Sequence, residues 1–600
     1  MLAGGAAAES LVFGVGHSLS GRRWLWRPAE ERVAQAIAQR LDLPEMLGRL
    51  LAARGVDADF AADFLDPTLR ALLPDPSVLV DMDAAADRLA AAVRGGETVA
   101  VFGDYDVDGA CSAALIAGLL RELGCPVLTH VPDRITEGYG PNGPALLALA
   151  GRGAGVIVCT DCGTAGAAAF AALEGRADVL VLDHHKAEGP PPPVVATVNP
   201  NRLDDRSGLG GLCATGIAFL AAVALLRALR RAGHFANRAE PNLLRLLDLV
   251  ALATVCDVMQ LTGLNRALVA QGLKVLARRD RPGLAALWEA AQVKDRPSAM
   301  SCGFALGPRI NAGGRIGDAE MGLRLLLCDD PVEARALAQA LDGVNRTRQT
   351  VEASILDEAL TQAGAQLDAG CAALLISGAG WHPGVVGIVA GRIKEKFNRP
   401  VCVAAAADGV LRGSARSVPG LDIGAAVIAA RQHGLLTSGG GHAMAAGFAL
   451  PESGRERFHA FLCERLAAAA LLPRATDLVV DAGVGVAGVT EALAEQVGRL
   501  APFGAGNEEP LFVVPNARPV RTDRLGADGA TLRSFVEGAS ADTRLKTMLF
   551  RAEDGPLARA LSARPAAPLH LVGQIRAEEW NGTRGVALFL RDAAEAAPHG

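Results

Sequence analysis

Aromatic residues are scarce in this sequence, and it has no excess of basic charge. Phenylalanine, tryptophan and tyrosine make up 4 % of its 600 residues, and the formal net charge is −6 at pH 7. A protein that coats nucleic acid over its whole surface would be strongly basic, so that class is excluded. A local basic groove remains compatible with the composition, because electrostatic attraction depends on where the charges lie.

Long apolar runs are also absent. No uninterrupted stretch approaches the roughly 20 apolar residues that a membrane-spanning helix needs. The short apolar run LVFGVG near the N-terminus has no basic residues in front of it, whereas a secretory signal would have them. We therefore expect a cytoplasmic protein that does not contact membranes.

The cysteines follow no regular spacing. There are eleven, an odd number, spread through apolar segments, which favours a reducing compartment and a role as small core residues. Cys159 and Cys162, in CTDC, have the spacing of a redox or zinc motif. No second CxxC motif exists to complete a zinc site, so a core role is favoured over a metal or redox role.

A chain of this length exceeds what one hydrophobic core can hold, so several domains are expected. From about residue 97 to 260, the short apolar runs TVAVFGD, VLTHVPD, GVIVCTD and VLVLDHH alternate with helical stretches. This pattern is typical of a parallel α/β sheet. Each run ends in or near an acidic residue, and ligands of such sheets bind beyond the carboxyl ends of the strands. The acidic side chains should therefore meet in one crevice.

The rest of the chain divides by its pattern. Asp330 and Pro331 form a helix start, and no further proline follows before about Leu367, which predicts a long connecting helix. A second α/β pattern comes next, and short β-like runs dominate after about residue 475. The expected fold class is α/β, with an N-terminal extension (1–75), a parallel-sheet domain (76–328), the connecting helix (329–368), a smaller α/β domain (369–468) and an OB-like β-barrel (475–595).

The stretch GDYDVDG crowds three carboxylates, those of Asp104, Asp106 and Asp108. Such carboxylates repel one another, so a cation is expected among them. An EF-hand loop is excluded, because its twelfth position would be Leu115 instead of glutamate and a strand-like run precedes the motif. If the motif is extended, alternate residues point the same way and all three carboxylates share one crevice.

Further candidate ligands follow the other predicted strands and one helix. Adjacent residues of an extended segment face opposite sides, so the neighbouring histidines of LDHH should not share one role. Oxygen ligands with an imidazole suit Mn²⁺ or Mg²⁺. The set is larger than one ion needs, which favours two ions about 3.5–4 Å apart, as in phosphate hydrolysis. The additional candidates are Asp161, Asp183, His184, His185 and Asp257.

The motifs resemble those of a known family. GDYDVDG, TDCG, LDHH and ATVCDVM match, in order, the four motifs of the DHH phosphoesterase superfamily. GWHPGVVGIVAGRI, RGSARS and GGGHAMAAGF resemble its DHHA1 domain. GPRINAGGRIGD and LAPFGAGNEEPLF narrow the resemblance to the bacterial RecJ exonucleases, which degrade single-stranded DNA from the 5′ end. The resemblance implies a DHH catalytic domain, a DHHA1 substrate-binding domain and a nucleic-acid-binding barrel.

The resemblance also implies roles at the centre. Asp161 would bridge two Mn²⁺ or Mg²⁺ ions, Asp104 would be a ligand or the partner of a ligand, and His185 would orient near the scissile phosphate. The implied metal ligands are Asp106, Asp108, Asp161, His184 and Asp257.

Several motifs predict contacts with the substrate. Arg412, Ser414 and Arg416 alternate, so they could share one strand face and bind phosphates. The glycines of GGGH are expected just before a helix, whose N-terminus favours anions. Trp580 lies beside the predicted hairpin turn Asn581-Gly582, where a stacking role and a structural role are both open. The candidate substrate-binding residues are Arg309, Asn311 and Arg315 in a glycine-broken loop, Arg412, Ser414, Arg416, Gly440, Gly441, His442 and Trp580.

The sequence therefore predicts a monomeric, single-stranded-DNA-specific 5′→3′ exonuclease that uses two metal ions and acts in DNA repair and recombination. Its partners by family resemblance would be single-stranded DNA, a single-stranded-DNA-binding protein and a helicase. One alternative is a small-substrate DHH phosphoesterase, such as an oligonucleotide phosphatase or pyrophosphatase, which should end soon after the second domain. Another is a non-catalytic scaffold for single-stranded nucleic acid, which should have lost metal ligands.

Overall fold

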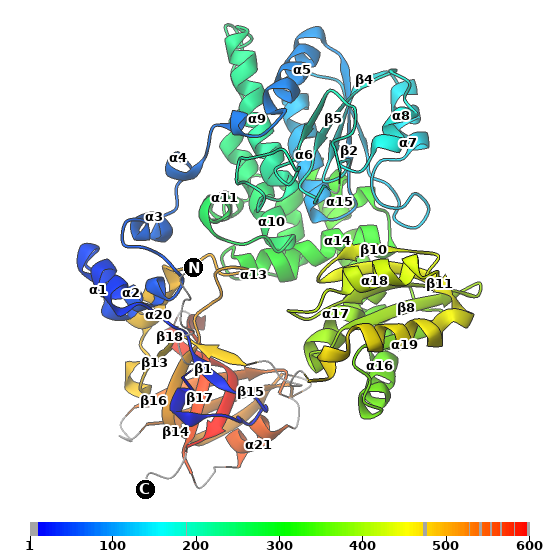
Figure 1. The fold of residues 1–600 in the computed structure, drawn as a ribbon. Helices are drawn as coiled ribbons and strands as arrows, with labels where there is room; N and C mark the ends of the chain where they lie inside the picture. The colour runs from blue at the N-terminus through cyan, green and yellow to red at the C-terminus, as the bar shows by residue number, and fades with distance from the viewer. Residues whose placement is uncertain are drawn as a thin grey trace, which may run out of the picture.

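Three folded regions make up the computed structural model (Figure 1). A first α/β domain (β2 to α15) is joined by the long helix α16 to a second α/β domain (β7 to α19), and a β-barrel domain (β12 to β18) follows. The structure describes residues 10–187, 189–471, 477–526, 529–538, 543–552, 555–563, 567–580 and 583–596.

The first domain is built on a five-stranded parallel sheet in the order β3-β2-β4-β5-β6. The chain leaves β2 towards β3 and then returns to place β4 on the other side of β2. Such a reversal of strand order opens a crevice beyond the carboxyl ends of the two strands. The strands are β2 (Thr98–Gly103), β3 (Val127–His130), β4 (Ala154–Thr160), β5 (Asp178–Leu182) and β6 (Ala196–Val198).

Both faces of this sheet are buried, which explains why its strands read as continuous apolar runs. Val99 and Val101 of β2 belong to the core formed with α5, α6 and α9, whereas Ala100 and Phe102 belong to the core formed with α7 and α8. Cys159 and Cys162 are fully buried in this second core. The helices are α5 (Met82–Gly95), α6 (Val107–Glu122), α7 (Gly143–Gly151), α8 (Ala167–Ala171) and α9 (Ala214–Arg231).

A helical region completes the first domain. It corrects one expectation, because the glycine-rich stretch around Asn311 is the helix α14 and not a loop. A Cβ atom at Gly314 would overlap the carbonyl oxygen of Tyr105, so the glycine allows this helix to lie directly against the aspartate-rich motif. The helices are α10 (Leu247–Cys256), α11 (Gly263–Leu276), α12 (Pro282–Ala290), α13 (Ala299–Ser301), the π-helical turn η4 (Cys302–Leu306), α14 (Gly307–Ile316) and α15 (Glu320–Leu327).

The connecting helix is α16, Pro331–Asp368, as the sequence predicted. Its N-cap is Asp330, whose carboxylate accepts hydrogen bonds from the backbone N–H groups of Val332 and Glu333. The helix has 38 residues, which at 1.5 Å per residue span roughly 57 Å. It therefore acts as a stiff spacer between the two α/β domains.

The second domain has a mixed sheet in the order β10-β11-β9-β8-β7, in which only β7 and β8 are parallel. The GGGH motif lies in edge strand β10 and not before a helix, contrary to the sequence prediction. Gly441 has a φ of 153°, and a Cβ there would overlap the backbone of Ala445 and Ala446. The elements are β7 (Leu374–Ala379), α17 (Val386–Phe397), β8 (Val401–Ala407), β9 (Val410–Arg416), α18 (Ile423–Gln432), β10 (Ser438–His442), β11 (Ala445–Pro451) and α19 (Arg455–Arg465).

The C-terminal region is an OB-like barrel, in agreement with the sequence prediction. Its six strands run in the order β13-β14-β15-β16-β18-β17, and an additional pairing of β14 with β17 closes the sheet. Trp580 pairs with Thr583, while Asn581 and Gly582 lie outside the described residues. The elements are β12 (Leu478–Val480), β13 (Ala482–Gly483), α20 (Glu491–Gly498), β14 (Phe512–Leu525), β15 (Thr531–Glu537), β16 (Arg544–Phe550), α21 (Pro556–Ser562), β17 (Leu569–Trp580) and β18 (Thr583–Glu595).

The N-terminal segment joins the barrel at the other end of the chain (Figure 1). Strand β1 (Trp24–Trp26) pairs in parallel with β12. Helices α1 (Glu31–Arg40) and α2 (Glu45–Ala52) contribute Ile37 and Leu50 to the core of the barrel. Helices α3 (Ala61–Leu65) and α4 (Leu69–Leu72) then lead to the first domain. The barrel is therefore completed by residues far away in sequence.

Arg266 connects three parts of the molecule. Its guanidinium is fully buried in α11 and donates hydrogen bonds to the carbonyl oxygens of Phe64, Leu500 and Ala501 at 2.8–2.9 Å. It also lies 3.8 Å above the ring of Phe64. Burial, followed by repulsion from Arg54, lowers the pKa of Arg266 to about 10. This side chain fastens the N-terminal segment and the barrel to the first domain.

Among the helices of the described ranges, none is both long and apolar enough to cross a membrane.

Arg266→Met should separate the barrel from the first domain. The variant keeps the length of the side chain but leaves the carbonyl oxygens of Phe64 and Ala501 without this donor, at a cost of about 1–3 kcal/mol each. The carbonyl oxygen of Leu500 keeps a hydrogen bond from Asn507. We expect a thermal midpoint lower by several degrees and faster proteolysis between the domains. The matched control is Arg245→Met, which removes an exposed pair with Glu122 and should have little effect. Equal shifts for both variants would contradict this role.

Candidate active site

The carboxylates predicted to share a crevice do meet at the reversal of the sheet. Asp104 follows β2, Asp161 follows β4 and Asp183 follows β5, all at the carboxyl ends of their strands. The aspartate-rich motif is not extended, however, because β2 ends at Gly103 and α6 begins at Val107. The three aspartates of the motif therefore point into two neighbouring groups of ligands instead of one row.

The side chains of the centre form three overlapping groups, and within each group the ligand atoms lie within 4.8 Å of one another. Asp161 belongs to two of these groups and His184 to two, so the groups form one continuous centre. The groups are Asp104, Asp106 and Asp161; Asp161, His184 and His185; and Asp108, His184 and Asp257.

Asp108 is held in place by the N-terminus of another helix. Its carboxylate accepts hydrogen bonds from the backbone N–H groups of Ala214 and Thr215, at 2.7 and 2.9 Å, and from the Thr215 hydroxyl at 2.6 Å. These residues begin α9, where unpaired N–H groups and the helix dipole favour a negative charge. The first turn of α6 is thereby fixed against α9.

His184 lies among three carboxylates. Its Nε2 atom is 3.2 Å from Oδ1 of Asp161, 3.6 Å from Oδ2 of Asp257 and 3.8 Å from Oδ2 of Asp108. Asp257 ends α10 as its C-cap. This arrangement suits an imidazole that shares a cation with its neighbours.

His185 does not face away from His184, contrary to the sequence prediction. Their ring centroids are 4.7 Å apart, because the chain leaves the strand after Leu182 and the Asp183 carboxylate accepts both backbone N–H groups. Nδ1 of His185 lies 2.8 Å from Asp183. Burial alone would lower the pKa of His185, but the hydrogen bond and charge of Asp183 raise it to about 9. The two histidines differ in exposure, with side chains 12 % and 41 % exposed.

The centre has more negative charge than its own residues can balance. Burial, reinforced by the neighbouring carboxylates, raises the pKa of Asp104 and Asp161 well above the usual range and that of Asp257 to about 8. Oδ1 of Asp104, Oδ1 of Asp161 and Oδ2 of Asp257 are buried and have no hydrogen-bond partner among the described residues. Unpaired buried oxygens beside an imidazole fit divalent cations of the Mn²⁺ or Mg²⁺ type.

The backbone of Asp161 has a φ of 61°, in the left-handed region. This conformation is uncommon for residues other than glycine, although aspartate tolerates it better than most. Its backbone N–H donates to the carbonyl oxygen of Leu182 at 3.0 Å, which holds the turn in place. Backbone strain of this kind concentrates at functional sites.

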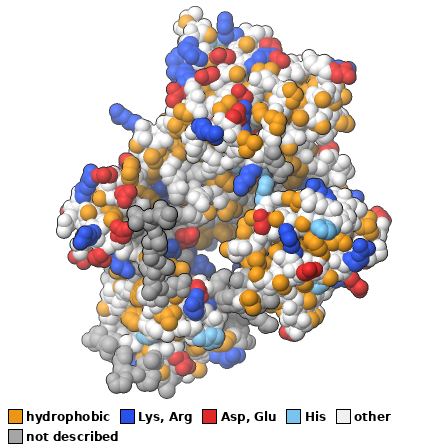
Figure 2. Space-filling view, in the orientation of Figure 1, with side chains coloured by type: hydrophobic (Ala, Val, Ile, Leu, Met, Phe, Trp, Pro, Cys, Tyr) orange, Lys and Arg blue, Asp and Glu red, His pale blue; other side chains and the backbone are white. Residues whose placement is uncertain are grey.

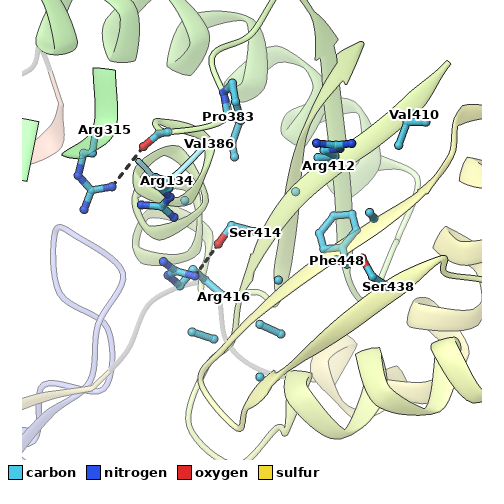
Figure 3. Close-up of a pocket in the computed structure, with 18 of the residues that line it drawn as sticks. Arg134, Arg315, Pro383, Val386, Val410, Arg412, Ser414, Arg416, Ser438 and Phe448 are labelled. Carbon is cyan, nitrogen blue, oxygen red and sulfur yellow. Dashed lines mark hydrogen bonds between the residues drawn. The ribbon is translucent and has the colours of Figure 1, made fainter. Parts of the chain in front are cut away.

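A cavity of about 1120 Å³ adjoins the centre and lies between the two α/β domains. Tyr105 and His185 line it from the first domain, and the described part of its lining includes no carboxylate. Figure 3 shows guanidinium groups from both domains around it. Its four arginines are Arg134, Arg315, Arg412 and Arg416.

None of these arginines forms an ion pair with another side chain of the described residues. Burial, followed by repulsion from Arg134, lowers the pKa of Arg416, and the same two causes lead in lowering that of Arg315 to about 10. Arg416 donates to the Ser414 hydroxyl at 2.8 Å, and Arg315 to the carbonyl oxygen of Gly384 at 3.2 Å (Figure 3). The molecular face in Figure 2 mixes acidic and basic side chains, so this basic cluster is a local feature. It is suited to an anion.

Most of the other residues that were predicted to bind substrate do not line the cavity as described. Arg309 pairs with Asp342 of α16 at 2.9 Å and does not line the cavity as described. Asn311 accepts a hydrogen bond from the backbone of Val107 at 3.2 Å and thus fixes the start of α6. Of the GGGH residues, Gly441 lines the cavity, whereas Gly440 and an exposed His442 are not part of its described lining. The side chain of Trp580 lies outside the described residues.

His382 shapes the turn beside the cavity. Its Nδ1 atom accepts a hydrogen bond from the backbone N–H of Gly384 at 3.1 Å. A Cβ at Gly384 would overlap the carbonyl oxygen of Arg315, so the glycine permits the two domains to approach. His382 therefore has a structural position in this turn.

Two tyrosines at the site were not predicted from the sequence. Tyr139 donates its hydroxyl to the carbonyl oxygen of Asp161 at 3.1 Å and lies 3.1 Å from Nδ1 of His185. Tyr105 stacks under Arg134, whose guanidinium is 5.1 Å from the ring centroid. The sequence contains only these two tyrosines. Two features of the sequence could have indicated a functional role. Tyrosine is rare in this chain, and one tyrosine lies inside the aspartate-rich motif while the other lies in a glycine-rich loop.

Asn199 and Asn201 also support the site and were not predicted from the sequence. The side-chain amide of Asn199 donates to the carbonyl oxygen of His185 at 2.8 Å, and that of Asn201 donates to the carbonyl oxygen of His184 at 2.6 Å. The two asparagines thus fix the backbone that carries both histidines.

Three family models match the chain in order. Residues 98–254 match the DHH family N-terminal domain, residues 368–468 the DHHA1 domain and residues 480–592 the RecJ OB domain. The single-stranded-DNA-specific exonuclease RecJ of Salmonella typhimurium is 40 % identical over 490 residues, which cover 78 % of this chain and 83 % of the relative. The chain belongs to the RecJ family.

Similarity to RecJ proteins extends over nearly the whole chain. RecJ of Bacillus subtilis is 32 % identical over 586 residues, or 96 % of this chain and 71 % of the relative. The crystal structure of RecJ from Thermus thermophilus in complex with Mn²⁺ is 31 % identical, with a TM-score of 0.78 over 96 % of this chain and 79 % of that one. A second structure of the same RecJ is a complex with Mg²⁺.

Asp161→Asn should stabilise the metal-free protein. When the folded pKa of a carboxyl is raised, its contribution to stability is fully present below the unfolded pKa, near 4, and is lost as the pH rises through the folded pKa. In EDTA, we expect the variant to melt higher than the unchanged protein at pH 8, by about 2–4 °C for each kcal/mol relieved, and to differ less at pH 5.

The same variant should lose most of its stabilisation by Mn²⁺, because a ligand is missing. Asp87→Asn, at an exposed surface position, should behave like the unchanged protein in both buffers. Full Mn²⁺ stabilisation of Asp161→Asn would show that Asp161 does not hold the ion.

Proposed function

We propose that this chain is a metal-dependent exonuclease that removes nucleotides from the 5′ end of single-stranded DNA, in DNA repair and recombination. The observation that carries the proposal is a cavity lined by four arginines that adjoins the carboxylate centre, with His185 and Tyr105 at their junction. A phosphate at the end of a strand could occupy the cavity while the next phosphodiester lies at the centre. The 5′ polarity rests on the resemblance to RecJ.

Two divalent ions, Mn²⁺ or Mg²⁺, would be held at the centre. Asp104, Asp106 and Asp161 would hold one, and Asp108, His184 and Asp257 the other, with Asp161 between them. The Mn²⁺ and Mg²⁺ complexes of Thermus RecJ support this choice of metal. When bound, such ions lower the pKa of a water and neutralise charge on a phosphate.

The residues of the chain would orient the phosphate. Asp183 favours the protonated form of His185, Tyr139 lies 3.1 Å from its Nδ1 atom, and the partly exposed ring lines the cavity. It can therefore donate a hydrogen bond to a phosphate oxygen. Asp104, buried and unpaired at Oδ1, would accept from the attacking water or bind an ion. Both roles are electrostatic and require fixed side chains.

Binding would be independent of sequence. The arginines of the cavity offer forked donors to phosphates, which carry no base information. The barrel would extend the grip along a single strand, and Trp580 remains the candidate for stacking on a base. A small-substrate phosphoesterase would have no use for such a barrel, so the exonuclease is favoured.

The first experiment compares single strands that differ only at the 5′ end. We expect mononucleotides to be released from the 5′ end with Mn²⁺, single strands to be cleaved far faster than blunt duplexes, and a 5′ phosphate to be preferred over a 5′ hydroxyl. Arg416→Met should reduce that preference at least about tenfold, because a buried charge-assisted contact contributes roughly 1.5–3 kcal/mol.

In Arg416→Met, the slope of the logarithm of the DNA-binding constant against the logarithm of the salt concentration should become shallower by up to about 0.7 per lost phosphate contact. Arg431→Met is the matched control, since Arg431 lies exposed on α18 of the same domain. Release of nucleotides from the 3′ end, or an unchanged end preference in Arg416→Met, would refute the proposal for the cavity.

A second experiment separates the histidines. His184→Ala should raise the Mn²⁺ concentration needed for half-maximal rate, with partial recovery in excess Mn²⁺, because it removes a ligand. His185→Ala should lower kcat and leave that concentration unchanged, because its role is to contact the phosphate. Coincident Mn²⁺ titrations for the two variants would mean that the histidines share one role.

A further inference from the structure

A cluster of sulfur and nitrogen ligands lies in the second domain, on elements other than those that form the cavity. The thiols of Cys371 and Cys463 and the imidazole of His459 have ligand atoms within 4.8 Å of one another. Cys371 lies in the connection between the end of α16 and the start of β7, and the other two residues lie on α19. Two segments of the chain that are about 90 residues apart in sequence are thus brought to one point.

The spacing within α19 is that of a metal site. His459 and Cys463 are four residues apart, so they lie one above the other on the same helix face. All three side chains are only partly buried. An ion can therefore reach them from solvent, and the thiols can lose their protons to water, which metal binding requires.

The histidine of this cluster is already oriented. Nε2 of His459 lies 2.9 Å from the carbonyl oxygen of Ala373, the buried residue that precedes β7. An Nε2–H donor leaves the lone pair of the neutral imidazole on Nδ1. Metal-binding histidines almost always donate their second ring N–H to a carbonyl or carboxylate in this way. Sγ of Cys463 lies 3.4 Å from the same carbonyl oxygen.

The donor set differs chemically from that of the active site. Two thiolates and an imidazole select zinc-like ions, whereas the oxygen-rich centre selects Mn²⁺ or Mg²⁺. Cys159 and Cys162, the CxxC pair of the sequence, are fully buried in an apolar core and form no such cluster in the described structure.

We propose that Cys371, His459 and Cys463 bind one zinc-class divalent ion, with water as the fourth ligand. Binding releases two thiol protons to solvent. Zn–S distances of about 2.3 Å and Zn–N distances of about 2.0–2.1 Å put tetrahedral ligands roughly 3.5–3.8 Å apart. The side chains therefore need to draw together only slightly. The ion ties the end of α16 to α19, where the chain enters and leaves the second domain.

Co²⁺ tests the site on the full-length protein. A thiolate bound to Co²⁺ gives an intense near-ultraviolet charge-transfer band that carboxylate ligands cannot produce. The protein is stripped with a chelator, reduced, and kept in excess Mn²⁺ so that the oxygen-rich centre is filled, and Co²⁺ is then titrated. We expect the band to saturate at one equivalent and to disappear on addition of one equivalent of Zn²⁺.

Cys371→Ser and Cys463→Ser should each lower the intensity of the band and weaken Co²⁺ binding at least tenfold. His459→Gln should weaken binding at least tenfold while the thiolate band persists at high Co²⁺, which a merely structural histidine would not do. Cys328→Ser is the matched control, because Cys328 is also partly exposed but lies in the first domain, and it should bind Co²⁺ normally.

Other outcomes would overturn the site. These are the absence of a thiolate band in the reduced protein, a band that survives in both Cys371→Ser and Cys463→Ser, or equal loss in Cys328→Ser. A disulfide between Cys371 and Cys463 that forms readily in a protein without Co²⁺ affinity would identify a redox pair instead. The experiment needs no DNA, so its result is independent of the exonuclease assay.

Discussion

Mutual repulsion of buried carboxylates is the constraint on which this structure depends. Asp104, Asp108, Asp161 and Asp183 are all buried within a few residues of strand ends, and their oxygens are brought together where the order of the sheet reverses. Such a group is unstable without compensating charge. Asp108 is compensated by the N-terminus of α9 and Asp183 by His185, which leaves the remaining oxygens for cations.

Hydrogen bonds and close backbone contacts around the centre hold its ligands in place. Asn311 holds the start of α6, Gly314 lets α14 approach Tyr105, and Tyr139 and two asparagines fix the histidine turn. Preorganisation of this kind is what makes electrostatic catalysis effective, because the donors and ligands do not have to reorganise during the reaction. The buried polar contacts are therefore part of the chemistry as well as of the fold.

The distance between the centre and its anion cavity is set by long-range packing. The stiff helix α16 carries the second domain, and the contact of Arg315 with the turn at Gly384 closes that domain against the first. The barrel is fixed by a different set of contacts, in which Arg266 joins three parts of the chain and the N-terminal strand β1 pairs with β12. A substrate that spans all three regions depends on each of these contacts.

Local pattern alone determined the parallel sheet, the long helix with its Asp330 cap, the barrel and the set of acidic and histidine ligands. Apolar runs, helix caps and crowded charges have consequences within a few residues of themselves. Tertiary structure alone decided which ligands pair, that α14 is helical, that the GGGH glycines form a strand, and that Arg309 binds Asp342 while Arg134 faces the cavity. These outcomes depend on close approach between segments far apart in sequence, where a missing Cβ or a facing charge outweighs local preference.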